Sequence, residues 1–187
     1  MSIFDFSKKK QTSIGIVPDK ETQKMLNTKE EETFTLFIKY LLDSGRFETN
    51  VESLVHKYKS APFNVITDGK LLSLDQKKEL GLNSRKKYGE NYIKILTQKG
   101  FSDNASVDFF ANSYYQTFGI ASRKFEIEKI KKSGITKCRI SSCNDMRDCE
   151  AIKKYGNKVF DVNHVPELPL PECTAEYCRC MIVAVLD

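Results

Sequence analysis

Six cysteines lie between positions 138 and 180, and the 137 residues before them contain none. Thiolates bind zinc strongly, and four of them complete the tetrahedral shell of a structural zinc site. Two pairs of cysteines are close enough in the sequence to supply two ligands each, one pair separated by five residues and the other by four. We predict one zinc ion bound by Cys143, Cys149, Cys173 and Cys178, with Cys180 as the reserve ligand.

Three other states of these cysteines are open at the level of sequence: buried inert thiols, a disulfide pair, or a redox switch. Disulfide frameworks are typical of small secreted domains. The opening segment places three lysines after a few apolar residues, unlike a secretory signal, and the longest apolar run, residues 181–186, is too short to cross a bilayer. We therefore expect a soluble protein of the cytoplasm, where metal binding best explains the cysteines.

The composition limits the size and class of the fold. The chain has 187 residues, of which 40% are hydrophobic and 29% charged, with few glycines and prolines. Such a chain buries a sizeable core, which excludes wholesale disorder, and it is too short for a large multidomain enzyme. We expect one ordinary domain with a small appended module.

Basic residues are concentrated between positions 123 and 160, where 11 lysines and arginines face 5 acidic residues. A basic stripe can bind the phosphates of a nucleic acid, although a solvated helix face has the same composition. As an alternative function we therefore consider a zinc-stabilised nucleic-acid-binding module. Its phosphate contacts would come from Lys129, Lys131, Lys132, Lys137, Arg139 and Arg147.

A zinc-dependent hydrolase or deaminase is a further alternative. The segments His164-Val165-Pro166-Glu167 and Pro171-Glu172-Cys173 partly match the deaminase signature, in which a histidine, a glutamate and a Cys-x-x-Cys pair act on a nucleobase. The spacing differs in both halves, and the sequence has no phosphate-binding loop or nucleophile elbow. We predict a non-enzymatic protein without catalytic residues.

The first two thirds of the chain have the periodicity of helices. A capping box at Thr28 and Glu31 precedes an apolar stripe that ends near Gly45, and a second, longer stripe runs from about Asp103 to Lys132. The residues before Thr28 show no regular spacing of apolar side chains. We predict a flexible N-terminal arm over residues 1–27 and a helical domain over 28–132.

Beyond Ser133-Gly134, three short segments are rich in β-branched or apolar residues, at 137–140, 159–162 and 180–186. They form, with the cysteines, a module over residues 133–187 that is too small to be stable through its core alone, so a metal would stabilise it. In an extended segment through Cys178 and Cys180, both thiols face one side. The predicted fold class is α+β: a mostly helical N-terminal body followed by a small β-containing, cysteine-rich, zinc-binding module.

The same module resembles the C-terminal part of the phage Mu protein F-like head morphogenesis proteins, the minor head proteins of tailed phages and prophages. The matching residues are Asp145-Met146-Arg147-Asp148-Cys149, Gly156 with Val159-Phe160, Leu168-Pro169-Leu170 and Cys178-Arg179-Cys180. Ile152 replaces the family's second cysteine, and Cys173 lies near the position of its histidine. Cys143 and Cys173 are the expected replacements.

This resemblance covers the last third of the chain and implies a non-enzymatic structural or head-assembly protein. Such a protein would act in the cytoplasm of the host cell or in the virion. It would dock on a protein partner of the portal or capsid type, and because heads assemble around DNA, a DNA contact is compatible with it.

Overall fold

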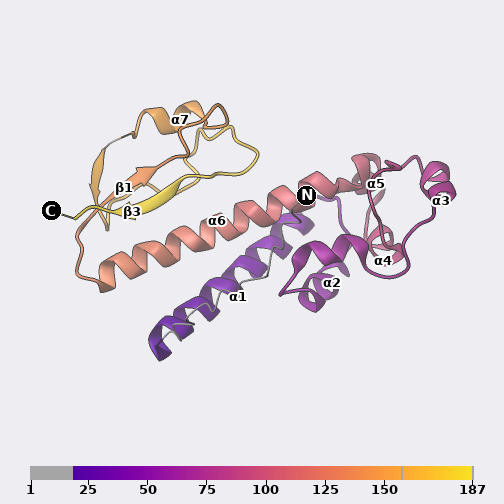
Figure 1. The fold of residues 1–187 in the computed structure, drawn as a ribbon, viewed down its shortest axis with the longest axis horizontal. Helices are drawn as coiled ribbons and strands as arrows, with labels where there is room; N and C mark the ends of the chain where they lie inside the picture. The colour runs from indigo at the N-terminus through magenta and orange to yellow at the C-terminus, as the bar shows by residue number, and fades with distance from the viewer. Residues whose placement is uncertain (1–18, 157, 187) are drawn as a thin grey trace, which may run out of the picture.

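The computed structural model describes residues 19–156 and 158–186, and its fold is α+β, as predicted (Figure 1). The helical elements are α1 (Lys20–Asp43), α2 (Val51–Lys57), η1 (Pro62–Thr67), α3 (Leu74–Glu79), α4 (Glu90–Lys94), α5 (Gln98–Ser102), η2 (Asn104–Ser106), α6 (Val107–Lys132) and α7 (Glu150–Lys153). The strands are β1 (Lys137–Ser141), β2 (Val159–Asp161) and β3 (Met181–Ala184). The described part is therefore a helical body followed by a small sheet.

Helix α1 begins at Lys20, so the predicted start at Thr28 is wrong. Asp19 is the N-cap residue, and its carboxylate accepts a hydrogen bond from the backbone N–H of Thr22 at 2.8 Å. The Thr28 hydroxyl instead donates to the carbonyl of Lys24 inside the helix. Of the predicted arm, residues 20–27 are thus helical, and residues 1–18 lie outside the described part of the chain.

Helices α1 and α6 run side by side in opposite directions and form the main packing contact of the helical body (Figure 1). Phe37 of α1 is fully buried and meets the rings of Phe110 and Tyr114 of α6 edge-on, with centroids 5.0 and 5.5 Å apart. The short helices α2, α4 and α5 contribute to the same core, in which Tyr88 and Tyr92 are fully buried.

The long helix α6 begins at Val107, a few residues later than predicted. Asn104, Ala105 and Ser106 all have positive φ angles, from 48° to 54°, which separate α6 from α5. This backbone is fixed from both sides, because the buried Tyr92 hydroxyl donates to the Ala105 carbonyl at 2.7 Å and the Ser106 hydroxyl donates to the Gly100 carbonyl at 3.0 Å.

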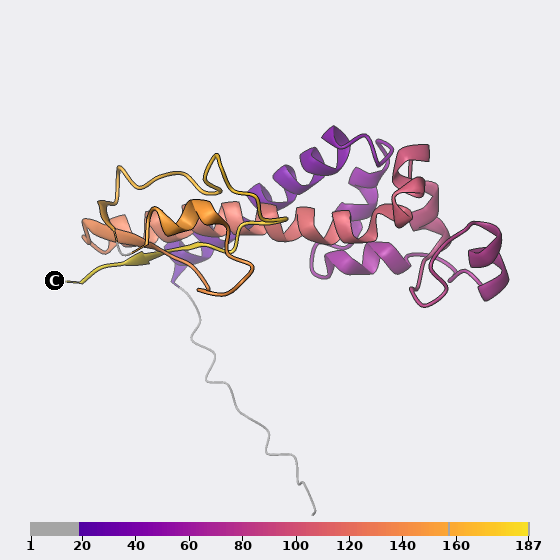
Figure 2. The ribbon, with the colours of Figure 1, turned by 90° about the horizontal axis from the view of Figure 1, so that it is seen from above.

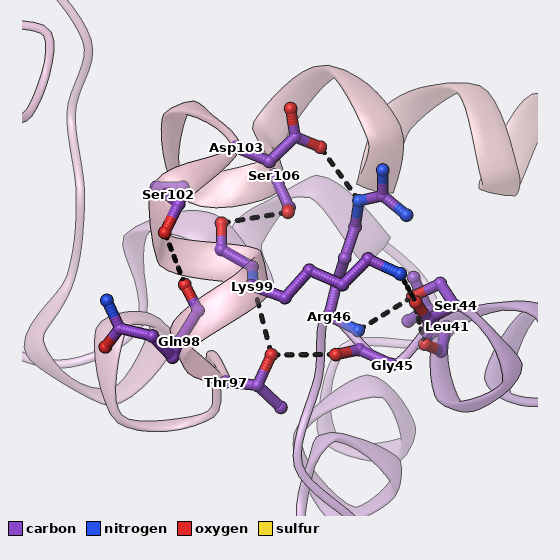
Figure 3. Close-up of polar contacts among 12 residues, drawn as sticks. Leu41, Ser44, Gly45, Arg46, Thr97, Gln98, Lys99, Ser102, Asp103 and Ser106 are labelled. Atoms are coloured by element: carbon purple, nitrogen blue, oxygen red, sulfur yellow. Dashed lines mark hydrogen bonds and ion pairs between the residues drawn. The ribbon is translucent and has the colours of Figure 1, made fainter.

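Polar contacts attach the end of α1 to α5 (Figure 3). The Thr97 hydroxyl caps α5 and donates to the Gly45 carbonyl, and the Lys99 ammonium donates to the Ser44 carbonyl at 2.7 Å. Arg46 forms an ion pair with Asp103 at 2.8 Å. These contacts hold the turn after α1 against the helix that leads into α6.

The C-terminal module has an antiparallel sheet in the order β2-β1-β3, with one strand in each of the three predicted segments. One face of the sheet, with Cys138, Ile140 and Ile182, packs into a second apolar cluster that includes Ile130 of α6. In Figure 1 this module and α1 lie on opposite sides of α6, and Figure 2 shows the module along the C-terminal half of α6. Helix α6 thus contributes to both cores.

Candidate metal centre

Four of the six cysteines come together in the C-terminal module. The thiols of Cys149 and Cys173, of Cys173 and Cys178, and of Cys178 and Cys180 lie near enough to act on each other's acidity. Cys149, Cys178 and Cys180 are buried, and Cys173 is partly exposed. All six cysteines are free thiols in the structure. Four sulfur donors are therefore neighbours in pairs, although they are up to 31 residues apart in the sequence.

Each of the four thiols is positioned by a short local structure. Cys149 is the N-cap residue of α7, whose Ala151 and Ile152 are buried in the apolar cluster of the module. The backbone N–H of Cys173 closes a turn on the Leu170 carbonyl at 2.9 Å. Cys178 and Cys180 precede β3, so the strand that was predicted to start at residue 180 starts at Met181.

Arg179 joins the two segments that carry most of the cysteines. Its guanidinium binds both carboxylate oxygens of Asp145, at 2.9 and 2.5 Å, and one oxygen of Asp148 at 3.1 Å. The Arg179 side chain is largely buried. Bidentate pairing of this kind fixes both distance and orientation. The loop before Cys149 is thereby attached to the segment 178–180.

This ion pair changes the acidity of its members. The hydrogen bonds and charge of Arg179, together with the backbone N–H of Arg147, hold the pKa of Asp145 well below its usual range. Asp145 in turn raises the pKa of Arg179. Both groups therefore stay charged across the physiological range, and the attachment persists there.

The thiols are also shifted in their acidity. The pKa of Cys178 is lowered to about 6, chiefly because the Cys180 thiol donates a hydrogen bond to it. The same contact raises the pKa of Cys180, and burial raises that of Cys173. Cys178 is thus the thiol of the group that ionises most readily, and hydrogen bonds from its neighbours stabilise its thiolate.

The cysteine segment rests on one face of α6. The Gln116 side-chain carbonyl accepts a hydrogen bond from the backbone N–H of Cys178 at 2.7 Å. The rings of Tyr115 and Tyr177 lie 5.3 Å apart. Two turns further along the helix, the buried guanidinium of Arg123 donates to the carbonyls of Cys178 and Cys180, each at 3.3 Å. Helix α6 therefore supports two of the four thiols directly.

The donor set suits zinc, which binds four thiolates in closed structural sites. In the residues the structure describes, however, no group of three or more His, Cys, Asp or Glu side chains has the arrangement of a formed metal site. The thiols make a chain of pairwise contacts, so ligation of one ion by all four would require them to turn from one another toward a common centre. The fit rests on donor chemistry and burial.

The other two cysteines lie outside this chain of contacts. Cys138 is buried in β1 among the apolar residues of the sheet. Cys143 is exposed in the loop after β1, close enough to Arg179 for its thiol charge to act on the guanidinium. Of the predicted ligands, the structure thus groups Cys149, Cys173 and Cys178 with the reserve Cys180, and leaves Cys143 at the surface.

Several of the basic residues considered for phosphate binding pair with carboxylates of the described residues. Lys129 pairs with Glu126, Lys131 with Glu128, Lys132 with Glu21, and Arg147 with Asp145. Lys137 and Arg139 have exposed side chains on β1. The carboxylates reduce the positive potential that a phosphate backbone would meet.

The histidine of the deaminase-like segment is at the surface. Its side chain is 84% exposed and lies 3.4 Å from Asp161 in the turn after β2. A catalytic base must reach the reacting atoms, and a zinc ligand must face the metal. His164 faces solvent and a surface carboxylate.

Arg123 and Gln116 are part of the site, and neither was predicted from the sequence. They lie on a polar stripe of α6 with Asn112 and Gly119, opposite the apolar stripe that packs on α1. In the sequence, a polar stripe that faces a site cannot be distinguished from one that faces solvent, so periodicity does not indicate the role of these residues. The glycine in the middle of a long helix was the one available signal.

None of the helices in the described residues combines the length and the apolar character needed to span a membrane. No family model matches the chain, and no curated protein or solved structure is significantly similar to it.

Proposed function

We propose that this protein is a non-enzymatic structural or assembly protein of the phage or prophage head type, in which a zinc-stabilised C-terminal module docks on a protein partner. One observation carries the proposal: the two motifs behind the family resemblance meet in space. Cys149 of the Asp-x-Arg-x-Cys segment joins the thiol chain of Cys178 and Cys180, and Asp145 of that segment binds Arg179.

The proposed zinc ligands are Cys149, Cys173, Cys178 and Cys180, so Cys180 takes the place given to Cys143 at the level of sequence. Their contacts and their burial support this choice. Zinc would supply a cross-link between the start of α7, the turn at 170–173 and the segment before β3. These segments have little regular structure, so their positions depend on such a cross-link.

A closed four-thiolate site supports a structural role over a catalytic one. Catalytic zinc sites keep one coordination position open for water or substrate, whereas four thiolates fill the tetrahedron. The exposed position of His164 agrees with this interpretation, because the histidine of the deaminase-like segment faces solvent and Asp161.

The zinc site is tested by metal analysis of the full chain purified without added metal. We expect one zinc per chain, lost in Cys149→Ser and Cys178→Ser. Cys143→Ser is the matched control, since Cys143 is an exposed cysteine of the same module, and it should keep the metal. A Cys149→Ser protein that retains both its zinc and its thermal stability would overturn the site.

The assembly role is tested separately, by mass spectrometry of particles released from the source cells on prophage induction. A head protein is expected in purified particles or in capsid assembly intermediates, at a fixed ratio to the capsid protein. Its absence from both, in a protein that binds zinc normally, would disprove the head assignment and leave the metal site intact.

A further inference from the structure

We propose that the guanidinium of Arg123 is the buried counter-charge of the four-cysteine cluster and strengthens its binding of a divalent metal ion. This inference rests on the zinc site proposed above. It assigns an electrostatic role to a residue of α6 that is not itself a ligand.

The burial of Arg123 is the first observation. The residue is 4% exposed, although arginine is rarely buried without a partner of opposite charge. Within the described residues no carboxylate forms an ion pair with it, and its buried Nε atom has no hydrogen-bond partner. Three backbone carbonyls accept its other hydrogen bonds, those of Cys178, Cys180 and Leu168. Carbonyls satisfy donors but leave the positive charge without compensation.

The anionic groups that act on Arg123 are thiols, and two of them belong to residues whose backbone carbonyls it binds. Cys178, Cys180 and Cys173 are the groups whose charge acts on the Arg123 guanidinium. Four thiolates around one divalent ion carry a formal net charge of about −2, because each thiolate contributes one negative charge. A buried cation beside them lowers the cost of holding that charge away from water. The single positive charge of the guanidinium thus offsets one of the two excess negative charges of the metal cluster.

The contacts of Arg123 also depend on the shape of the guanidinium. Its planar fork reaches the carbonyls on both sides of Arg179 with one nitrogen and the Leu168 carbonyl with the other. A lysine ammonium offers the charge without the fork. Arg123→Lys and Arg123→Met therefore separate charge from geometry.

Gly119 provides the space for this side chain. A Cβ atom at position 119 would lie 2.9 Å from Nη1 of Arg123 and 3.5 Å from the Cys178 carbonyl oxygen. Glycine weakens the interior of a helix relative to alanine. Its position in the middle of α6 agrees with a requirement for room beside the guanidinium.

The experiment measures zinc affinity of the full chain by competition with a chromophoric chelator, for the wild type, Arg123→Met, Arg123→Lys and Lys124→Met. We expect Arg123→Met to bind zinc about tenfold more weakly or worse, as is typical when an outer-shell group of a metal site is removed. Arg123→Lys should recover part of the loss. Lys124→Met removes a neighbouring cation that pairs with Glu32, and it should match the wild type.

Cobalt(II) replaces zinc for a spectroscopic readout. At saturating cobalt, Arg123→Met should keep the absorption of a four-thiolate site, because the ligands are unchanged and only the counter-charge is lost. A spectrum that reports the loss of a thiolate would overturn the counter-charge role, since Arg123 would then be holding a ligand in place.

Gly119→Ala keeps the proposal testable if Arg123→Met does not fold. Alanine favours the helix but displaces the guanidinium, so we expect an intact far-UV circular dichroism spectrum with weaker zinc binding. If the wild type binds no zinc, the proposed function and this inference both fail. If the wild type binds one zinc, and Arg123→Met or Gly119→Ala binds it as tightly, this inference alone fails.

Discussion

Asp68 is a buried carboxylate in the helical body that organises three side chains around it. It accepts hydrogen bonds from the Lys57 ammonium at 2.7 Å, the Tyr58 hydroxyl at 2.5 Å and the Asn91 amide at 2.9 Å. These donors lower the pKa of Asp68 to about 2, from an ordinary value of 3.8. One residue thus joins the end of α2 to α4 through the ionised form of its side chain.

The lowered pKa of Asp68 predicts a loss of stability in acid. Its stabilising contribution is complete above the unfolded-state value near pH 4 and is lost as the pH falls through it toward 2, by about 2 kcal/mol for a shift of this size. Asp68→Asn should therefore be destabilised by about 2 kcal/mol at pH 7 and should lose this difference from the wild type by pH 2. Urea unfolding followed by far-UV circular dichroism measures both effects.

The exposed Glu79→Gln variant is the control for Asp68→Asn, because its carboxylate is at the surface of α3. It should unfold like the wild type at each pH. Equal stability of Asp68→Asn and the wild type at pH 7 would show that the three hydrogen bonds add nothing to the ionised state.

Helices α6 and α1 together support the cysteine module. Helix α6 presents its polar stripe to the segment 176–180, while its apolar stripe packs on α1. Helix α1 extends to Lys20 and so reaches the C-terminal end of α6, where Glu21 pairs with Lys132. The length of α1 therefore determines how much of α6 is supported.

The start of α1 is tested by comparing two caps. Asp19→Ala removes the carboxylate that accepts from Thr22, so the amide protons of the first turn should exchange with deuterium faster. Thr28→Ala should leave the first turn protected, because Thr28 lies in the helix interior. Hydrogen exchange followed by NMR distinguishes the two variants. Faster exchange in Thr28→Ala alone would place the cap at residue 28 instead.

Gln116 is the element-level contact between α6 and the cysteines. Gln116→Ala leaves the partly buried N–H of Cys178 without its acceptor, which should lower the free energy of unfolding by about 1 to 2 kcal/mol. Asn112→Ala, one turn earlier on the same stripe, removes an exposed contact to Glu176 and should cost less than about 0.5 kcal/mol. Thermal unfolding of the zinc-loaded proteins compares them, and equal losses would contradict the prediction.

For the whole molecule, the central fact is that two apolar clusters share one helix. The cluster of the helical body lies between residues 34 and 110, and that of the cysteine module lies between 130 and 182. The cluster of the helical body contains large aromatic side chains. The buried residues of the module's cluster have smaller side chains, and they include three of the four thiols of the candidate site. The two halves should therefore differ in their dependence on metal.

Removal of the metal should unfold the module and spare the helical body. With a strong zinc chelator, limited proteolysis should cut within residues 133–186 and leave a fragment that ends near Lys132, since the first core contains no cysteine. Mass spectrometry identifies the cut sites, and Cys149→Ser without chelator should give the same fragment. Resistance of both halves in the presence of chelator would show that the module is stable without metal.

The sequence by itself determined the parts of this protein that depend on neighbouring residues. Apolar periodicity located the long helix that ends at Lys132, and β-branched segments located all three strands. The closeness of Cys178 and Cys180 in the sequence also placed their thiols near each other, as the structure has them. These signals are short-range, so they can be recognised without the fold.

Only the tertiary structure decided which groups meet. It placed the Cys180 thiol near those of the other grouped cysteines and left Cys143 at the surface. It also paired Arg179 with Asp145 and buried Arg123. It also moved the start of α1 to Lys20, because the cap at Asp19 allows the helix to run through Thr28. Partners separated by 30 or more residues are chosen by packing, and the spacing of cysteines along the chain has no fixed relation to their distances in space.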